Sequence, residues 1–340
     1  MKCTIQNIAD HLGLSRNTVS KALKNSSEVS ENTRNLVIKT ASKLGYKNAT
    51  FATPVIPASE TGSNGTILFL TRTYASDSEF WTTVLRGIES ILSNANYHLA
   101  ISIMSDSDLK QLNFPQTISD SSIKGIILVE ICDKVVCDAL SQFNLPIVSV
   151  DMPNVPFEEL NGIDVVTMES KKNLKKIINQ LIEKGAESFG FVGDLYSPNV
   201  SRGFQERYNA LSECLAEHQL PLNQKNCLLH QTPEDFWNFQ TTVNNLQAMI
   251  SLPDVFICGN DWTAIQLIYA LQFLGFQIPK DICVVGFDNI PAASRISPSL
   301  TTISTPQKYL GIAAARQILE RIQPVSYTHL RAHETAANLV

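Results

Sequence analysis

The 340-residue sequence lacks the features that would direct it to a membrane, to secretion or to common catalytic chemistry. No apolar run approaches the roughly 18 residues that a membrane span needs, and the start, Met1–Asn7, has no apolar signal-peptide core. The motifs G-x-S-x-G, G-x-x-x-x-G-K-[ST], H-E-x-x-H and G-x-G-x-x-G are all absent. We therefore expect a cytoplasmic protein that is not an enzyme and uses neither a cofactor nor a metal ion.

Cysteine is arranged in a way that argues against a disulfide framework. The seven cysteines are odd in number and include no C-x-x-C pair. Most of them stand inside apolar runs, as Cys258 does after Val255-Phe256-Ile257. Buried thiols in a reducing compartment are the simplest interpretation.

Positive charge is scarce overall but concentrated at one end of the chain. The sequence has 27 lysines and arginines against 32 aspartates and glutamates, a net charge of −5. Residues 1–47 nevertheless carry a net charge of +5, which leaves −10 for residues 48–340. This asymmetry predicts that only the amino-terminal head binds a polyanion.

The chain is longer than one ordinary domain and divides into four segments by composition. Residues 1–47 are predicted to be helical, and residues 48–64, which include Pro54 and Pro57, form a linker. Residues 65–323 alternate short β-branched runs with helical patterns, and this alternation predicts an α/β fold with parallel sheets in two lobes. We place lobe 1 at about 65–163 and 292–320, and lobe 2 at about 164–291. Residues 324–340 are interpreted as an atypical, non-native tail.

The predicted elements of the two lobes alternate along the chain. The strands are expected at 66–70, 98–103, 125–129, 146–150, 188–192, 254–258 and 282–285. The helices are expected at 79–93, 134–142, 170–183, 204–217, 234–250, 263–274 and 308–321. Ligands of such folds bind beyond the carboxyl ends of the strands, so we expect a site in a cleft between the lobes.

Two apolar stripes at helical spacing, separated by a glycine, mark the start of the head. Gly13 can adopt the left-handed backbone that ends a helix, and Ser15 can cap the helix that follows. A third helix is predicted to begin at Ser30. The apolar positions are Ile5, Ile8, Ala9 and Leu12 in the first helix, Val19, Ala22 and Leu23 in the second, and Leu36, Val37, Ala41 and Leu44 in the third. This spacing predicts a helix-turn-helix in a three-helix domain.

The second helix of the head presents polar side chains suited to a DNA duplex. Arg16 can bond guanine and Asn17 can bond adenine, while Ser20 and Lys21 can reach phosphates. The alternative is a generic three-helix bundle with a solvated polar face. The local basic charge makes that alternative the weaker one.

These stretches resemble the DNA-binding domain of the lactose-repressor/galactose-repressor (LacI/GalR) family of bacterial transcription regulators. The resemblance rests on Ile8-Ala9, Gly13-Leu14-Ser15, Thr18-Val19-Ser20-Lys21-Ala22-Leu23, Val29-Ser30, Thr33-Arg34 and Leu44-Gly45-Tyr46. It implies that Arg16, Asn17 and Lys21 read bases. It also implies that Thr4, Ser15, Thr18 and Ser20 contact phosphates.

The resemblance continues through the body of the chain. It is carried by stretches such as Pro146–Asp151, Gly259–Asp261, Ile278–Asn289 and Leu300–Ile303. It implies a two-lobed sensor core of the type I periplasmic-binding-protein kind, shared with periplasmic sugar-binding proteins. The linker departs from the family pattern, because it has no leucine that could wedge into the minor groove and contains the helix-breaking Pro57. We therefore predict weaker operator bending or a different half-site spacing.

Three polar residues stand where the predicted elements favour ligand contact. Asp151 ends a strand, Asp261 follows one, and Arg207 lies near a helix start, with Arg202 as its rival. Carboxylates and guanidinium groups can bond vicinal hydroxyls of a sugar, and the resemblance implies effector contacts at these positions. Each can instead be an N-cap or a surface ion pair.

Aromatic residues complete the predicted effector site. The resemblance implies contacts around Ser78–Trp81, which include Phe80 and Trp81. The family's stacking aromatic falls near Gln231, which offers no aromatic face. Trp262 can replace it, although core packing explains a lone tryptophan equally well.

The sequence as a whole is interpreted as a homodimeric, ligand-responsive transcription regulator. We expect a repressor of a carbohydrate-utilisation operon that binds a pseudo-palindromic DNA operator and a small sugar effector. Nucleobases and phosphorylated sugars are alternative effectors. The alternative functions are an activator of the same family, a solute-binding protein without DNA function, and a sugar- or nucleotide-modifying enzyme.

Overall fold

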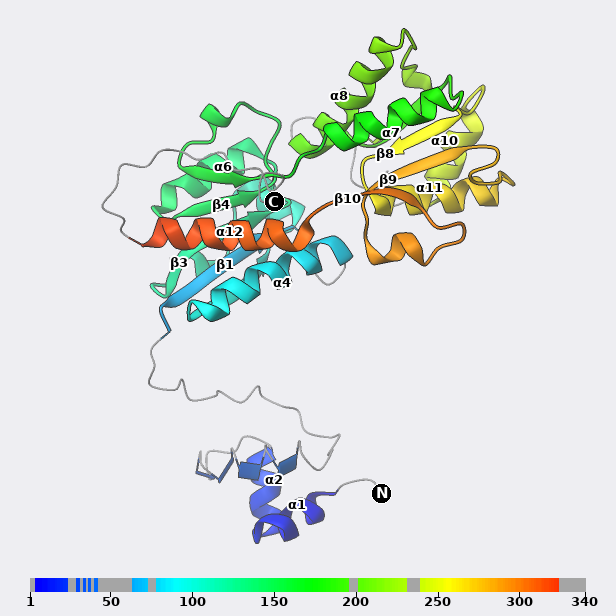
Figure 1. Cartoon of the computed structure of the whole chain (residues 1–340). Coiled ribbons are helices and arrows are strands. Elements are labelled where there is room, and N and C mark those ends of the chain that lie inside the picture. The colour runs from blue at the N-terminus through cyan, green and yellow to red at the C-terminus, as the bar shows by residue number, and fades with distance from the viewer. Residues whose placement is uncertain are drawn as a thin grey trace. The chain divides into compact units, whose positions relative to one another are not determined.

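The computed structural model describes residues 4–23, 29–30, 33–34, 36–37, 40–41, 63–72, 78–195, 201–230 and 239–323. The chain divides into two units, Met1–Gly62 and Ser63–Val340 (Figure 1). Nearly all of the predicted linker and the whole predicted tail lie outside the described residues, as do Gln231 and the start of the helix expected at 234–250.

The first unit contains the predicted helix-turn-helix. Helix α1 (Ile5–Leu12) begins at a capping box in which the Thr4 hydroxyl accepts from the Asn7 amide. It ends at Gly13, whose φ of 65° is left-handed. Helix α2 (Arg16–Leu23) follows, and the Ser15 hydroxyl accepts from the Thr18 amide at 3.0 Å. The two caps therefore fix where each helix starts; the sequence predicts the Ser15 cap, and the Thr4 cap is seen only in the structure.

A small apolar core joins these helices to a third helical segment. Residues 33–34, 36–37 and 40–41 are helical. The core is made by Ile8, Ala9, Val19, Ala22, Val29, Val37 and Ala41. The prediction of Leu36 as an inner residue is wrong, because Leu36 is 50% exposed while Val37 beside it is buried. Neighbouring residues on a helix point about 100° apart, so only one of the two can face this core.

The second unit contains two five-stranded sheets, and all of their strand pairs are parallel. The first sheet has the order β2-β1-β3-β4-β5 and the second β10-β9-β8-β6-β7. The first-sheet strands are β1 (Gly65–Thr71), β2 (Tyr97–Ile103), β3 (Ile123–Val129), β4 (Ile147–Val150) and β5 (Ile163–Val166). The second-sheet strands are β6 (Phe189–Asp194), β7 (Leu228–His230), β8 (Val255–Cys258), β9 (Cys283–Asp288) and β10 (Thr301–Ser304). The predicted parallel α/β fold is confirmed.

Helices connect successive strands within each lobe. The α-helices are α4 (Glu79–Asn94), α5 (Asp106–Gln111), α6 (Lys134–Leu140), α7 (Lys172–Glu183), α8 (Arg202–Glu217), α10 (Phe239–Ala248), α11 (Asp261–Phe273) and α12 (Gln307–Ile322). The 3-10 helices are η2 (Gln116–Ser119), η3 (Ser141–Phe143), η4 (Phe157–Glu159), η5 (Gln224–Asn226) and η6 (Pro291–Ser294). No helix in the described ranges is long and apolar enough to cross a membrane.

The lobe limits differ from those expected from the sequence. Strand β5 belongs to the first sheet, so lobe 1 extends to Val166 instead of 163. Strand β10 pairs with β9, with Thr301 opposite Val285, so the chain returns to lobe 1 only at α12 and not at residue 292. Strand β7 has three residues, and β5 and β10 have four residues that are only partly buried, so they lack the continuous apolar run of the equally short but fully buried β4 and β8.

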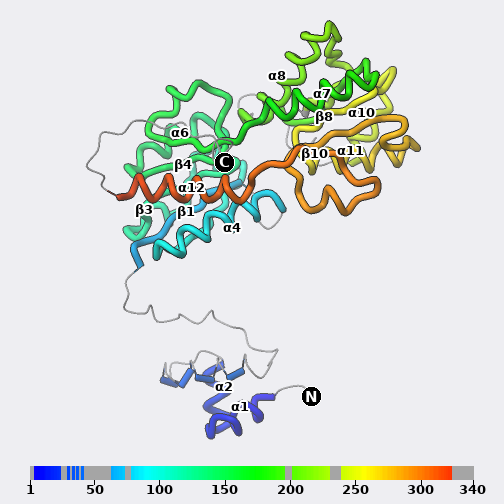
Figure 2. Tube along the Cα trace, in the orientation of Figure 1, coloured from blue at the N-terminus to red at the C-terminus, as the bar shows by residue number. Residues whose placement is uncertain are grey.

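Helix α12 returns to the first lobe and lies beside α4 (Figures 1 and 2). Two glycines make this close packing possible. A Cβ atom at Gly87 would lie 2.2 Å from the Lys308 carbonyl oxygen, and one at Gly311 would lie 2.0 Å from that of Val84. Any larger residue at these positions would push the helices apart, so α12 is held tightly against the lobe in which the chain began.

Candidate functional site

The exposed side of α2 carries the residues predicted to read DNA. Arg16 and Asn17 are exposed at its first turn, and Lys21 is partly exposed one turn later. The first turn contains no acidic residue, so the positive end of the helix dipole faces solvent without a competing carboxylate. This surface can therefore contact the phosphate oxygens and the base edges of a DNA duplex.

The residues predicted to contact phosphates lie around the two helix starts. Thr4 and Ser15 are exposed N-terminal neighbours of α1 and α2, and Thr18 and Ser20 are partly exposed on α2. The hydroxyl groups of Ser15 and Thr18 also lie 2.8 Å apart, in hydrogen-bond contact. The capping role of Ser15 and a phosphate contact are compatible, because a hydroxyl that accepts a backbone N–H can still donate its own proton to a phosphate oxygen.

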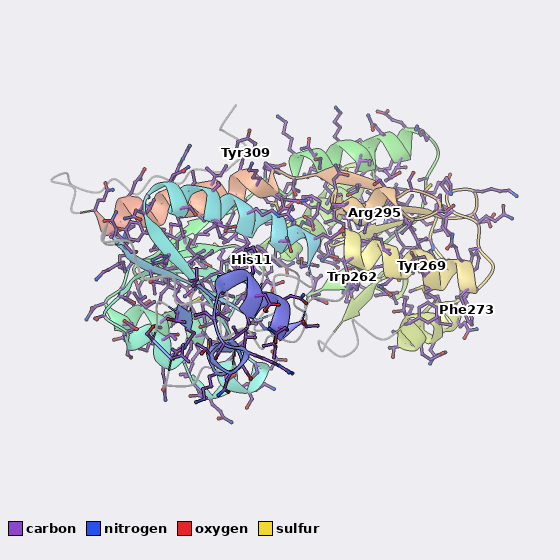
Figure 3. All side chains as sticks on the ribbon, turned by 90° about the horizontal axis from the view of Figure 1, so that it is seen from below. His11, Trp262, Tyr269, Phe273, Arg295 and Tyr309 are labelled. Carbon is purple, nitrogen blue, oxygen red and sulfur yellow. The ribbon has the colours of Figure 1, made fainter. Side chains whose placement is uncertain are left out.

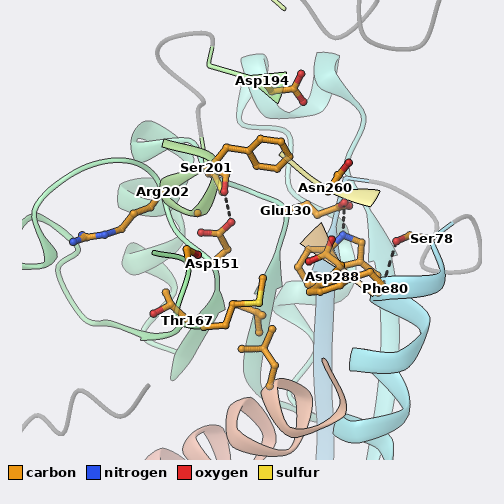
Figure 4. A pocket seen from close by; sticks show the side chains of 18 of the residues that line it. Ser78, Phe80, Glu130, Asp151, Thr167, Asp194, Ser201, Arg202, Asn260 and Asp288 are labelled. Carbon is orange, nitrogen blue, oxygen red and sulfur yellow. Dashed lines mark hydrogen bonds between the residues drawn. The ribbon is translucent and has the colours of Figure 1, made fainter. Parts of the chain in front are cut away.

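A cavity of about 980 Å³ opens in the second unit (Figure 4). Residues at the carboxyl ends of strands from both sheets line it. They are Glu130 after β3, Asp151 after β4, Thr167 after β5, Asp194 in β6, Asn260 after β8 and Asp288 in β9. Parallel sheets place ligand sites at these ends, so the cavity is the candidate small-molecule site.

Asp151 joins the two lobes at one wall of the cavity. Its Oδ1 atom accepts from the Met152 amide at 2.8 Å, and its Oδ2 atom accepts from the Ser201 hydroxyl. Figure 4 shows the Asp151 and Ser201 side chains facing each other. Burial raises the pKa of Asp151, and the hydrogen bond from Ser201 partly opposes that rise. Asp151 therefore has a fixed orientation at a site where its charge is incompletely solvated.

Arg207 lies at the buried end of the cavity. It is 4% exposed, and its Nη1 atom donates to the Gly259 carbonyl oxygen at 2.5 Å. Its guanidinium carbon lies 3.9 Å from the Phe287 ring centre and 5.3 Å from that of Phe204. Burial lowers the pKa of Arg207, and the negative charge of Asp288 opposes this change. The aromatic rings and the carbonyl thus hold the guanidinium plane in one position.

Asp288 completes this buried group. It is 7% exposed, and its Oδ1 atom has no hydrogen-bond partner among the described residues. Burial raises its pKa from 3.8 to about 8, although the charge of Arg207 acts in the opposite direction. The Gln307 amide donates to the backbone oxygen of Asp288 at 2.6 Å, so the strand end is fixed while the carboxyl group faces the cavity.

Aromatic side chains form another part of the cavity lining. Phe80 and Trp81, at the start of α4, lie edge to face with ring centres 4.7 Å apart. The Trp81 indole nitrogen donates to Glu130. Trp262 also lines the cavity and is 40% exposed. All three predicted aromatic residues therefore border the same space.

The chain matches two family descriptions. Residues 4–48 match "Bacterial regulatory proteins, lacI family", and residues 178–337 match "Periplasmic binding protein-like domain". The chain therefore joins a lacI-family DNA-binding domain to a periplasmic-binding-protein-like domain.

Several curated relatives match nearly the whole length of this chain. The ribose operon repressor of Haemophilus influenzae is 27% identical over 94% of this chain and 92% of its own length. The HTH-type transcriptional repressor PurR of Photobacterium profundum is 26% identical, again over 94% of this chain and 92% of its own length. Both are named as repressors, which agrees with the repressor interpretation of the sequence.

Two solved structures show the same fold. The cellobiose complex of the transcriptional regulator CelR has a TM-score of 0.65 and 18% identity, and covers 94% of this chain and 93% of its own. The lac repressor dimer bound to operator and the anti-inducer ONPF has a TM-score of 0.61 and 18% identity, with 95% and 93% coverage. The three-helix head and two-lobed core are thus a known combination.

The position of Asp261 differs from what the sequence predicted. It is completely buried and is absent from the cavity lining. Its Oδ1 atom accepts from the Thr302 hydroxyl at 2.5 Å, and its Oδ2 atom accepts from the Ile290 amide at 2.8 Å. The carboxylate therefore ties α11 to β10 and to the segment after β9, because its side chain points under the helix start instead of into the cavity.

The choice between Arg207 and Arg202 is also clarified by the geometry. Both line the cavity, but Arg202 donates to Glu206 at 3.0 Å and lies over the Phe157 ring at 4.3 Å. Figure 4 shows the Arg202 side chain running away from Asp151. Arg207 is therefore the better placed cation for a buried ligand.

Sequence reasoning missed Asn260 and Asp288. Asn260 lines the cavity while its side chain caps α11 by accepting from the Thr263 amide at 2.9 Å. Both residues directly follow or end an apolar strand run, which is the signal that could have identified them.

Proposed function

We propose that this lacI-family protein is a ligand-responsive repressor of a carbohydrate-utilisation operon. The observation that carries this proposal is the presence, in one chain, of a basic helix-turn-helix head and a separate cavity at the carboxyl ends of two parallel sheets. The head supplies the operator contacts and the cavity senses the effector. Such a regulator works in the cytoplasm, where the operator lies, and needs no catalytic step.

In this proposal α2 enters the major groove. Arg16, Asn17 and Lys21 read base edges, and Thr4, Ser15, Thr18 and Ser20 contact phosphates. The exposure of Arg16 and Asn17 at the first turn supports the assignment. One operator half-site is bound by each head of a dimer.

The cavity is proposed to bind a small sugar. Phe80, Trp81 and Trp262 offer apolar ring faces, while Asp151 and Arg207 offer groups that bond hydroxyls in pairs. The names of the ribose operon repressor and of the CelR–cellobiose complex support a sugar as the class of effector. Asp261 is left out of this contact set because it is buried outside the cavity.

A homodimer is proposed because α11 has an exposed aromatic face. Tyr269 and Phe273 are four residues apart on this helix and are 45% and 68% exposed (Figure 3). The ring of Phe239 on α10 lies 5.7 Å from that of Phe273 and extends the patch. A group of exposed aromatic side chains is typical of a protein interface. The operator-bound lac repressor structure is a dimer, which supports a second copy as the occupant.

The effector signal is proposed to pass through contacts between the lobes. The Glu79 carboxylate at the start of α4 accepts from the Ala292 amide at 2.7 Å and from Arg295 at 3.0 Å. The Ser201–Asp151 bond spans the lobes at another wall of the cavity. A ligand that binds one lobe arrangement better than another shifts the population between them, and the dimer transmits that shift to the heads.

The test is a gel-shift titration of the full-length protein with its own promoter fragment. We expect binding that weakens steeply as salt rises, and release or retention on addition of the right sugar. Arg16→Ala should weaken specific binding by about 1–3 kcal/mol, whereas Gln6→Ala, on the exposed side of α1, serves as the matched control. Absence of binding at low salt, with and without sugars, would overturn the proposal.

A further inference from the structure

The first turn of α8 belongs to the second lobe but contacts the first. The Arg202 amide donates to the Met152 carbonyl oxygen at 2.9 Å, and Ser201 pairs with Pro153 in an isolated antiparallel bridge. Residues 151–162 connect β4 to β5 in the first sheet, whereas the rest of α8 packs in the second lobe. Backbone contacts therefore join the lobes at this wall of the cavity.

The Arg202 side chain strengthens this contact. Its Nε atom donates to Glu206 on the same helix at 3.0 Å, and its Nη1 atom donates to the Val155 carbonyl oxygen at 3.3 Å. Its guanidinium carbon lies 4.3 Å from the centre of the Phe157 ring, which belongs to the first lobe. A guanidinium group is attracted to an aromatic face and stacks on it. Arg202 is therefore held by its own helix on one side and by the first lobe on the other.

The same helix carries Arg207, the buried cation of the cavity. On the first lobe, Met152 directly follows Asp151 in the sequence. A Cβ atom at Gly203 would lie 3.5 Å from Arg207 Nη2 and 3.6 Å from Asp151 Oδ2, so the start of α8 lies close to both groups. Because a helix moves as a unit, the contact of Arg202 with the first lobe sets the distance between the Asp151 carboxylate and the Arg207 guanidinium.

Phe157 takes part in this contact without bordering the cavity. It is not among the described residues that line the cavity, whereas Arg202 is. Its ring packs against a buried apolar cluster of the first lobe. Figure 4 shows Arg202 and Asp151 on one side of the cavity and Phe80 on the other. A change at Phe157 can therefore affect a bound ligand only through the arrangement of the lobes.

We propose that Arg202 and Phe157 are positioning residues, which hold the two lobes together at one wall of the cavity and keep it at the spacing that binds the effector. The spacing is that between Asp151 and Arg207, which reach the sugar from opposite lobes. This inference rests on the proposed function and concerns the regulation of the same site. Without the contact, a smaller fraction of the protein has the lobe arrangement that binds, and the apparent affinity falls by that fraction.

Hydrogen exchange of the full-length protein without sugar tests the contact directly. Phe157→Ala should speed exchange of the Arg202 amide, which is bonded to Met152. It should also speed exchange of the Ala292 amide by about threefold or more, because the Glu79 carboxylate of the other lobe accepts from this amide at 2.7 Å. A loss of packing confined to the first lobe leaves the Ala292 amide unchanged, so this amide separates positioning from local structure.

Matched variants serve as controls. Phe143→Ala removes another half-buried ring that packs against the same apolar cluster, and it should leave the Ala292 amide at its native rate. Phe157→Tyr keeps an aromatic face for Arg202 and should restore native exchange. Arg202→Ala removes the other partner without touching the core of the first lobe, and it should speed exchange of the same amides. Native exchange at Ala292 in a folded Phe157→Ala or Arg202→Ala protein, or equal acceleration by Phe143→Ala, would overturn the proposal.

Calorimetry then measures the consequence for ligand binding. The probes are D-ribose and cellobiose, the sugars named for two of the related proteins. Phe157→Ala should weaken binding of the probe that the native protein binds by about tenfold, although its ring lies outside the cavity lining. Phe143→Ala should leave that affinity unchanged. Undiminished affinity in a Phe157→Ala protein whose exchange is accelerated would overturn the positioning role.

Failure of this inference and failure of the proposed function give different results. A native protein that binds neither probe nor its promoter fragment loses the repressor function, while exchange at Ala292 still decides whether Arg202 and Phe157 hold the lobes together. A protein that binds operator and sugar but shows native exchange in Phe157→Ala keeps its function and refutes the inference.

Discussion

Buried charged side chains are concentrated where the strands end at the cavity. Arg207 and Asp288 are both more than nine-tenths buried, and Asp151 is bonded to Ser201. Burial moves the pKa values of all three residues in the direction of their neutral forms. Such groups reduce the stability of the unliganded protein and are characteristic of functional sites. Asp261, in contrast, has both carboxylate oxygens bonded within the protein.

The raised pKa of Asp288 predicts a pH-dependent stability. The folded protein holds a proton on Asp288 up to about pH 8, whereas the unfolded chain releases it near its ordinary value of 3.8. Between these two pH values the native state therefore binds more protons than the unfolded chain. The contribution of the Asp288 carboxyl group to the free energy of unfolding thus falls as pH rises through that range. Asp288→Asn removes the titration and should raise the free energy of unfolding at pH 8 by about 1–3 kcal/mol.

Urea unfolding of this variant at several pH values provides the measurement. The difference in free energy of unfolding between Asp288→Asn and the native protein should grow from pH 5 to pH 8, because this range lies between the ordinary and the raised pKa of Asp288. The control, Asp138→Asn, should show no such trend. Parallel pH curves for the native protein and Asp288→Asn would show that the carboxyl group is not kept neutral by burial.

At the scale of elements, helix starts and helix crossings determine where the functional side chains lie. Caps at Thr4 and Ser15 set the starts of α1 and α2, and the Asn260 cap sets that of α11. The glycines of α4 and α12 allow those two helices to pack closely. The start of α4, which carries Phe80 and Trp81 to the cavity, is therefore positioned by a helix that arrives from the other end of the chain.

The α4–α12 crossing can be tested by adding one methyl group. Gly311→Ala would place a Cβ atom 2.0 Å from the Val84 carbonyl oxygen, which is backbone and cannot rotate away. We expect the free energy of unfolding to fall by about 1–3 kcal/mol through overpacking. Gly203→Ala in α8 is the control, because its nearest neighbours lie 3.5 Å away and alanine favours helix. Equal stability of the two variants in urea would contradict the tight crossing.

At the scale of the whole molecule, charge and exposed apolar surface are segregated. The head is basic, the rest of the chain is acidic, and the exposed aromatic residues of α11 form one patch. Each feature matches one proposed partner: DNA for the head, a small molecule for the cavity and a second copy for the aromatic patch. A palindromic operator then requires two copies of the chain, so that each head binds one half-site.

The dimer is tested by replacing two aromatic residues of the patch. Tyr269→Ser with Phe273→Ser removes the most exposed rings of α11 and should weaken self-association by about tenfold or more, since buried aromatic anchors dominate interfaces. Sedimentation at graded concentrations measures this change, and operator affinity should fall with it. The control is Ile250→Ser, an exposed apolar residue outside the patch. A double variant that remains a dimer at the same concentrations would show that α11 is not the interface.

Local patterns in the sequence were sufficient for most of the fold. The seven expected strands and seven expected helices correspond to observed elements, because each shows an apolar period or a continuous β-branched run. Short elements were missed, namely α5, β5, β7 and β10. Their positions depend on pairing with strands distant in the chain, as when Thr302 lies opposite Gly286.

The sequence by itself determined the helix-turn-helix and the parallel α/β lobes, and it showed the resemblance of the head to lacI-family domains, since caps, apolar periods and motifs are local properties of the chain. Only the tertiary structure decided which charged residues border the cavity. Asp261 and Asp288 both stand near strand ends, yet the first is bonded beneath a helix and the second faces the cavity. Side-chain direction at a strand end depends on neighbouring strands and helices that lie far away in the sequence, so no local pattern contains it.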